Sequence, residues 1–163
     1  MAEGGSNGRG LIVVGVDGSD HSRKALRWGA RLAGIFGARL QAVIAWEYPP
    51  SFGWAAVPDN WDPREDTLKL LRETVLEVFG DKPPAGLELQ VREGSAARAL
   101  LDASEGADLL VVGSRGHGGF AGLLLGSVSA NVAEHAPCPV LIIHGDQLPP
   151  SLTVPAGQSA TAG

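Results

Sequence analysis

The sequence predicts a single α/β domain in which a parallel β-sheet is covered by helices on both faces. Three observations support this fold class. The near-continuous apolar run LIVVGV at residues 11–16 is typical of a strand that is buried on both sides. Segments with helical spacing of apolar residues alternate with further strand-like segments, which indicates crossover connections between parallel strands. The length of 163 residues suits one domain with a substantial core.

The predicted elements follow one another as strand and helix, without an internal repeat. We expect five strands, at residues 11–16, 39–46, 87–93, 108–113 and 140–144. Ser19, Asp62 and Ser95 are placed to cap the first three helices, and Pro63 stands at the first position of the second. The expected helices cover residues 19–36, 62–79, 95–105 and 127–136. Ligands of such sheets bind beyond the carboxyl ends of the strands, where the strand order reverses, so the connections after residues 16 and 112 are the expected site.

Composition restricts the class of protein and its environment. Residues 1–10 and 145–163 are rich in Gly, Pro, Ser and Ala, so we expect disordered tails around a folded domain at residues 11–144. The net charge of -5 argues against a nucleic-acid partner. No apolar stretch reaches the roughly 18 residues of a membrane span, and no signal peptide is evident. The single cysteine, Cys138, cannot form an internal disulfide, so we expect a cytoplasmic protein.

A glycine-rich connection between the fourth strand and the last helix, residues 113–127, is the strongest candidate for binding chemistry. Glycine lets backbone amides approach a ligand closely and permits positive φ angles. The connection leads into the first turn of a helix, whose amides and partial positive charge favour a phosphate. The hydroxyls of Ser127 and Ser129 and the guanidinium of Arg115 are further candidates for phosphate contacts. The alternative is a connection whose glycines only end a strand and start a helix.

Two familiar nucleotide-binding motifs do not fit this connection. A Walker A motif needs a lysine before Ser or Thr, and the sequence has no lysine after Lys82, which excludes a P-loop NTPase. The run from Gly116 to Ala121 formally fits the dinucleotide pattern G-x-G-x-x-A. It follows the fourth strand, however, and no acidic residue stands at a later strand end to hold a ribose, so we reject this interpretation.

Three parts of the chain resemble the universal stress protein family. The spacing Gly113-x2-Gly116-x9-Gly126-Ser127 matches that family's ATP-binding signature, G-2x-G-9x-G-[S/T], without a gap. The opening VVGVDGSDHSRKAL and the ending GSVSANVAEHAPCPVLII are similar to the first and last segments of the family, so the resemblance covers about residues 11–143. It implies a flavodoxin-like fold with five parallel strands in the order 3-2-1-4-5. It also implies a homodimer joined through the last strand, Val140 to His144.

The same resemblance implies the ATP-binding subclass, with ATP lying across the ends of the first and fourth strands. It assigns the adenosine end to Gly15, Val16 and Asp17, with Ala45 against the adenine. It assigns the ribose and phosphates to Gly113, Gly116, Gly126, Ser127 and Val128. Mg²⁺ on the phosphates is implied by the family alone. From the sequence alone, Asp17 is as well suited to forming a turn as to contacting a ribose, because it opens an Asp-Gly-Ser run.

The remaining candidates have plainer interpretations. The four histidines, among them His117 in the glycine-rich connection, do not fall at metal-ligand spacing, and His117 suits solvent as well as a triphosphate. Cys138 lies between two prolines and is expected to be a packing residue. Aromatic residues gather in a loop at residues 46–61, where they suit packing on the domain, closure over a nucleotide or a partner surface. They are Trp46, Tyr48, Phe52, Trp54 and Trp61.

The sequence predicts no catalytic set. The glycine-rich connection contains no acidic residue, and His117 is its only candidate base, so any turnover is expected to be slow. We therefore expect a universal stress protein that binds ATP and acts as a nucleotide-dependent regulator in a stress response. Three alternatives stay open: a slow ATPase or nucleotidyl-transfer enzyme, a cAMP-binding protein, and a dimeric interaction module that needs no nucleotide.

Overall fold

A computed structural model describes residues 9–48, 58–116 and 125–144 of the chain. These residues form a five-stranded parallel sheet in the order β3-β2-β1-β4-β5, which confirms the predicted fold and strand order. The strands are β1 (Leu11–Gly15), β2 (Arg39–Trp46), β3 (Glu88–Glu93), β4 (Leu109–Gly113) and β5 (Val140–Ile143). The helices are α1 (Asp20–Phe36), α2 (Pro63–Phe79), α3 (Ala96–Ala103) and α4 (Ser127–His135). Nearly all of the two predicted tails lies outside the described residues.

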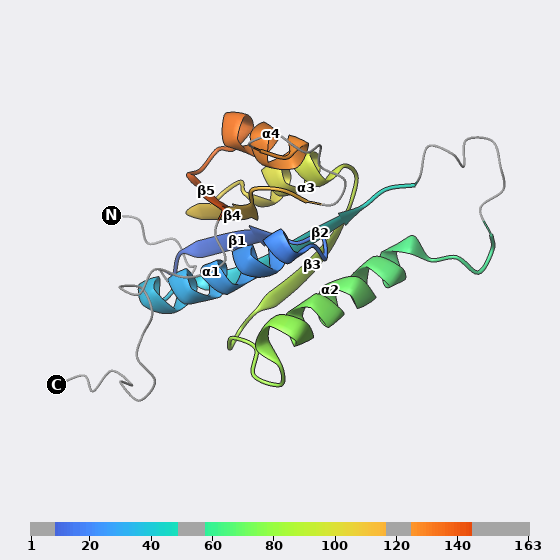
Figure 1. Ribbon diagram of the computed structural model, residues 1–163, viewed down its shortest axis with the longest axis horizontal. Coiled ribbons are helices and arrows are strands. Elements are labelled where there is room, and N and C mark those ends of the chain that lie inside the picture. The colour runs from blue at the N-terminus through green and yellow to red at the C-terminus, as the bar shows by residue number, and fades with distance from the viewer. Residues whose placement is uncertain (1–8, 49–57, 117–124, 145–163) are drawn as a thin grey trace.

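Helices cover both faces of the sheet (Figure 1). On one face, α1 and α2 pack over Ile12 and Val14, while on the other α3 and α4 pack over Val13 and Val43. Alternate residues of β1 therefore enter two separate apolar clusters. This explains why the strand reads as a continuous apolar run, since neither of its faces meets water. Burying each such side chain stabilises the fold by about 1.5–3 kcal/mol.

The first three helices begin where side-chain caps were predicted. Ser19 accepts a hydrogen bond from the amide of Ser22 at the start of α1. Asp62 accepts from two amides at the start of α2, and Ser95 accepts from the amide of Arg98 at the start of α3. Each cap satisfies backbone donors that the helix itself leaves unpaired.

The third helix ends earlier than predicted, at Ala103 instead of residue 105. The hydroxyl of Ser104, fully buried, donates to the carbonyl of Leu101 (2.8 Å) and closes the last turn. Gly106 then takes a positive φ of 78°, which directs the chain back toward β4.

The strand order reverses between β1 and β4, which lie side by side. β1 leads into α1 on one face of the sheet, whereas β4 leads toward α4 on the other (Figure 1). The two connections therefore separate at the carboxyl edge of these strands, which is where parallel α/β sheets bind ligands.

Candidate functional site

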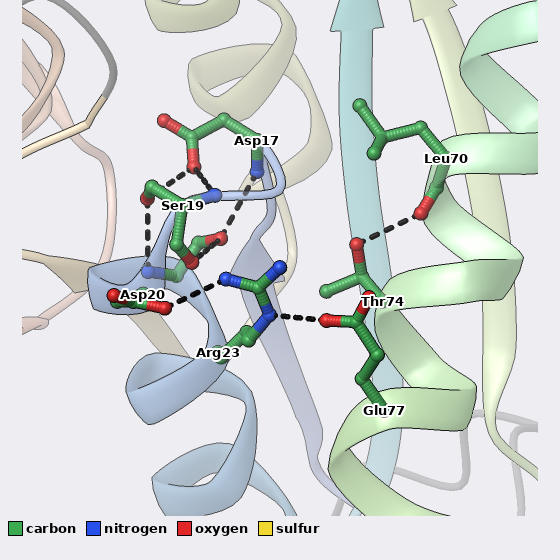
Figure 2. A network of polar contacts seen from close by, with 8 residues as sticks. Asp17, Ser19, Asp20, Arg23, Leu70, Thr74 and Glu77 are labelled. Atoms are coloured by element: carbon green, nitrogen blue, oxygen red, sulfur yellow. Dashed lines mark hydrogen bonds and ion pairs between the residues drawn. The ribbon is translucent and has the colours of Figure 1, made fainter.

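The connection between β1 and α1 is a tight turn held by its own side chains (Figure 2). The Oδ1 atom of Asp17 accepts hydrogen bonds from the amide (2.9 Å) and the hydroxyl (2.5 Å) of Ser19. The hydroxyl oxygen of Ser19 accepts from the amide of Ser22 (3.2 Å), and that of Ser22 accepts from the amide of Asp17 (3.3 Å). Three backbone amides of this turn therefore have acceptors within the chain.

Hydrogen bonds also bring the end of β4 next to the start of α4. The carbonyl of Gly113 accepts from the buried hydroxyl of Ser129 (2.6 Å). The amide of Gly126 donates to the carbonyl of Ser114 (2.8 Å), and the amide of Ser114 donates to Ile143 on β5 (2.9 Å). The two ends of the glycine-rich connection are thus adjacent in space.

Two glycines of this connection lie closely against atoms of the β1–α1 region. A Cβ atom on Gly113 would lie 2.7 Å from the backbone carbonyl of His21, in the first turn of α1. A Cβ atom on Gly116 would collide with the Oδ2 atom of Asp17. Neither these glycines nor Gly126 has a positive φ, so close packing, and not a left-handed backbone, accounts for glycine at 113 and 116. The contact between Gly116 and Asp17 joins the two connections at the sheet edge.

Gly126 differs from those two glycines, because a side chain would fit there. Its Cβ atom would stand 3.4 Å from the Cα of Arg115 and 3.6 Å from the amide nitrogen of Gly116, which are ordinary contact distances. A methyl group at this position would therefore cover the exposed backbone of Gly116 without straining the fold.

Among the four helices of the described residues, only α4 has no side-chain cap at its N-terminus. Its capping residue is Gly126, with extended backbone angles (φ −69°, ψ 163°) and no side chain to offer. Ser127 follows in an exposed position, while Val128 is half-buried. The first-turn amides of α4 therefore stand at the sheet edge without a capping acceptor, and the helix dipole makes this point favourable for an anion.

The residues predicted for the site gather at the carboxyl edge of the sheet. Gly15, Val16 and Asp17 end β1, and Ala45 stands near the end of the neighbouring β2. The predicted residues on the other connection, which end β4 and open α4, are Gly113, Arg115, Gly116, Gly126, Ser127, Val128 and Ser129. Asp17 lies against Gly116, and Gly126 lies against Arg115, whereas Ala45 lies one strand away and pairs with Arg92 of β3. His117 lies outside the described residues.

Sequence reasoning missed three residues that shape this edge. The hydroxyl oxygen of Ser22 accepts a hydrogen bond from the amide of Asp17. Leu70 of α2 lies against Gly18, where a Cβ atom would stand 3.1 Å from a Leu70 methyl group. His21 borders Gly113, and its Nδ1 atom is buried with no hydrogen-bond partner among residues 9–48, 58–116 and 125–144. The serine at the third position after the Ser19 cap could have signalled the first contact. The other two depend on long-range packing.

Other candidate groups lie away from this edge or form no site. The described residues hold no cluster of three His, Cys, Asp or Glu side chains suited to a metal ion. Cys138 lies near the start of β4, beside Ser104 and Asp108, at the opposite edge of the sheet, and burial raises its pKa above the usual 9.0. This thiol is therefore less reactive than a free one, as expected of a packing residue.

Three of the loop aromatics stack edge to face. The ring centroids of Trp46 and Tyr48 are 5.1 Å apart, and those of Tyr48 and Trp61 are 6.0 Å apart. Phe52 and Trp54 lie outside the described residues.

No helix within the described ranges is long and apolar enough to cross a membrane.

The sheet order, the two helix layers and the open start of α4 together define a flavodoxin-like α/β domain with a candidate ligand edge. The sequence profile of the universal stress protein family matches residues 9–144. A universal stress protein of Thermus aquaticus is 36% identical over 135 residues, which cover 81% of this chain and 96% of that protein. The chain belongs to the universal stress protein family.

One further relative is about twice as long as this chain, and another was crystallised with cAMP. A universal stress protein of Mycolicibacterium smegmatis is 32% identical over 142 residues, covering 83% of this chain and 48% of that protein, so the chain spans about half its length. A crystal structure of a universal stress protein in complex with cAMP is 32% identical, with a TM-score of 0.60 over 83% of this chain and 96% of that one. A universal stress protein from Lactobacillus plantarum has a TM-score of 0.66 at 22% identity, over 85% and 100% of the two chains, and supports the fold.

Proposed function

We propose that the chain binds an adenine nucleotide, with ATP as the first candidate, at the carboxyl edge of β1 and β4. The observation that carries this proposal is the uncapped first turn of α4, which lies directly beside the exposed backbone of Gly116. Helix N-terminal amides next to a glycine backbone are suited to phosphate oxygens. The unbroken family signature and the relative that was crystallised with cAMP support adenine as the base.

On this proposal the two connections divide the ligand between them. The amides of Ser127 and Val128, with the exposed Ser127 hydroxyl, contact the phosphates, and Gly126 contributes by having no side chain, since its own amide donates to Ser114. Arg115 and His117 add charge-assisted or polar contacts. The buried hydroxyl of Ser129 donates to Gly113, so its part is to hold the start of α4 in place and not to bind phosphate. The residues at the adenosine end are Gly15, Val16, Asp17 and Ala45.

Mg²⁺ is compatible with this edge only as an ion held mainly by the ligand. Asp17 is the carboxylate that lies against Gly116, and the described chain offers no three-residue metal cluster. Mg²⁺ commonly keeps several waters and binds through one or two carboxylates together with substrate phosphates. Because Asp17 belongs to the adenosine end in our proposal, such an ion would be held by phosphate oxygens and water, and its role would be to neutralise phosphate charge.

The nucleotide acts, in our proposal, as a bound signal in a stress response, and hydrolysis is slow at most. Asp17 Oδ1 already accepts two hydrogen bonds from Ser19, so this oxygen is engaged in the turn and is poorly placed to act as a general base. Turnover above ~0.1 per second, approaching the usual enzyme range, would instead favour an ATPase or nucleotidyl-transfer enzyme.

The direct test is calorimetric titration of the full chain with ATP, comparing wild type with Gly126→Ala. The added methyl group fits the fold but covers the Gly116 amide, so we expect ATP affinity to fall at least about tenfold, ~1.4 kcal/mol. Gly34→Ala is the matched control, because Gly34 in α1 is exposed and has open space around its Cβ. Equal ATP affinity in wild type and Gly126→Ala would show that the nucleotide does not use this edge.

A second candidate ligand is cAMP, which the 32% identical relative binds in its crystal structure. Competition decides between the two ligands: if ATP is the physiological one, millimolar cAMP leaves bound ATP in place. Displacement of ATP by a lower concentration of cAMP than of ATP itself would make cAMP the preferred ligand.

We further propose a homodimer joined through β5 and a cytoplasmic location. β5 is the last strand of the sheet, and three of its four residues, Val140, Leu141 and Ile142, are only half-buried. An edge of this kind offers backbone groups and apolar side chains to a second copy. Light scattering after gel filtration should give twice the chain mass of 16.8 kDa. A monomer mass at micromolar concentration would contradict the dimer, whereas partners captured equally with and without nucleotide in pull-downs would favour the interaction-module alternative.

A further inference from the structure

We propose that α2 responds to occupancy of the nucleotide site through the turn between β1 and α1. This inference rests on the proposed function and names the element that would report the bound state. Three sets of contacts link the glycine-rich connection to α2 through this turn.

The first contact joins the turn to the glycine-rich connection. The Oδ2 atom of Asp17 lies against Gly116, while its Oδ1 atom is held by the amide and hydroxyl of Ser19. A carboxylate oxygen has lone pairs for more than one hydrogen bond, so a ribose hydroxyl at this edge can donate to Asp17. Such a bond would add a further constraint to the turn that caps α1.

The second contact joins the same turn to α2. Gly18 has a positive φ of 81°, and the Leu70 methyl groups lie where its side chain would be, 3.1 Å and 3.4 Å from an ideal Cβ. Leu70 is 40% exposed, so this contact with the turn provides part of the limited burial of its side chain. A turn that is held more rigidly gives Leu70 a more constant surface to pack on.

The third contact is an ion-pair bridge from the first turn of α1 to α2 (Figure 2). Arg23 donates through Nε to Glu77 (2.6 Å) and through Nη1 to Asp20 (2.8 Å). The Arg23 side chain is only 25% exposed, although its acceptors are far more so. Exposed ion pairs contribute little stability singly, but an arginine fixed between two carboxylates fixes the relative position of the helices that carry them.

These contacts predict the direction of the response. A nucleotide that holds Asp17 stabilises the turn, and the turn then stabilises the docking of α2 on α1. Coupling is reciprocal, so loss of α2 docking must weaken nucleotide binding by the same factor by which the nucleotide stabilises the docked state. α3 lies on the opposite face of the sheet and has no part in these contacts, so it provides the internal reference.

Hydrogen–deuterium exchange of the full chain, with and without saturating ATP, tests the response directly. We expect amides in α2 around residues 70–77 to exchange at least about fivefold more slowly with ATP, the lower end of ordinary coupling factors, and more so than those of α3. Equal slowing in α2 and α3, or no slowing in α2, overturns the inference although ATP binds. No calorimetric heat for ATP overturns the proposed function as well, so the two failures are distinguishable.

A pair of matched double variants tests the contacts themselves. Leu70→Ala with Glu77→Gln removes both links to the β1–α1 region, and we expect about a fivefold loss of ATP affinity together with loss of the ATP effect on α2 exchange. Leu76→Ala with Glu73→Gln makes the same chemical changes on α2, at the 61% exposed Leu76 and at a glutamate paired with Lys69 of its own helix. The control should retain both properties. If both double variants behave alike, the named contacts do not carry the response.

Discussion

The start of α1 and the start of α4 face the same edge of the sheet but treat their backbone donors differently. At α1, Asp17, Ser19 and Ser22 bind three amides of the turn within the chain. At α4, the capping residue is Gly126, and the described chain offers no side chain in its place. The difference separates a helix start whose donors are satisfied within the chain from one whose donors, in our proposal, are satisfied by a ligand.

This comparison also gives each connection a part in one site. The satisfied turn is the rigid partner, because its carboxylate lies against Gly116 and fixes one wall of the edge. The open helix start supplies donors and a favourable potential for an anion. Mutations that remove the cap at the start of α1, or add one at the start of α4, therefore test the contribution of each helix start to stability and to ligand binding.

The largest expected effect comes from breaking the packing that holds the two connections together. Gly113→Val would push a side chain into the backbone carbonyl of His21 at the start of α1, and relief would require moving either the start of α1 or the strand that pairs Gly113 with Ile143. We expect the free energy of unfolding to fall by about 3 kcal/mol, the upper part of the usual overpacking range. Urea denaturation would measure this, with Gly34→Val in open space as the control, and a change below ~1 kcal/mol would contradict the packing described.

A smaller effect should follow from giving α4 the cap that α1 has. The extended backbone at Gly126 suits an aspartate, whose carboxylate would accept first-turn amides and occupy the place proposed for a phosphate. Gly126→Asp should raise stability by a few tenths of a kcal/mol, as expected for glycine replaced at a cap, and lower ATP affinity at least about tenfold. Unfolding and calorimetry together decide: retained ATP affinity in a stabilised variant would remove the open helix start from the proposed site.

The last comparison in this series concerns the serines at the two helix starts, and the change expected for Ser127→Ala is the smallest. Ser19→Ala removes a cap and a partner of Asp17, so a loss of about 1–2 kcal/mol in unfolding free energy is expected. Ser127→Ala should change stability by less than ~0.5 kcal/mol, because the exposed Ser127 caps nothing within the described chain. Thermal unfolding of the two variants side by side provides the measurement, and equal losses would show that the two helix starts do not differ as described.

Local signals in the sequence were sufficient to predict every strand and helix, because capping and apolar spacing act over a few residues. Ser19, Asp62 and Ser95 were each predicted as caps and each accepts backbone amides. The strand order came from the family resemblance, since periodicity does not specify which strands are neighbours. The end of α3 was placed two residues too late, because the buried hydroxyl of Ser104 closes the helix in a way that composition does not reveal.

The candidate site was predicted as a set of residues but not as a set of contacts. The sequence predicts that Gly113 and Gly116 approach a ligand, which stays a prediction, and the structure adds that His21 and Asp17 lie where a Cβ at these positions would be. Leu70 carries no motif and enters only because α2 packs beside the β1–α1 turn. Such relations join residues far apart in the chain, and one sequence alone does not contain them.

The contact between Asp17 and Gly116 has a consequence for how this family can diverge. Because a carboxylate fills the space above Gly116, any residue with a Cβ at position 116 is tolerated only when position 17 becomes smaller or turns away. The two positions should therefore change together during evolution, and shortening the side chain at 17 should restore the stability that a single replacement at 116 costs.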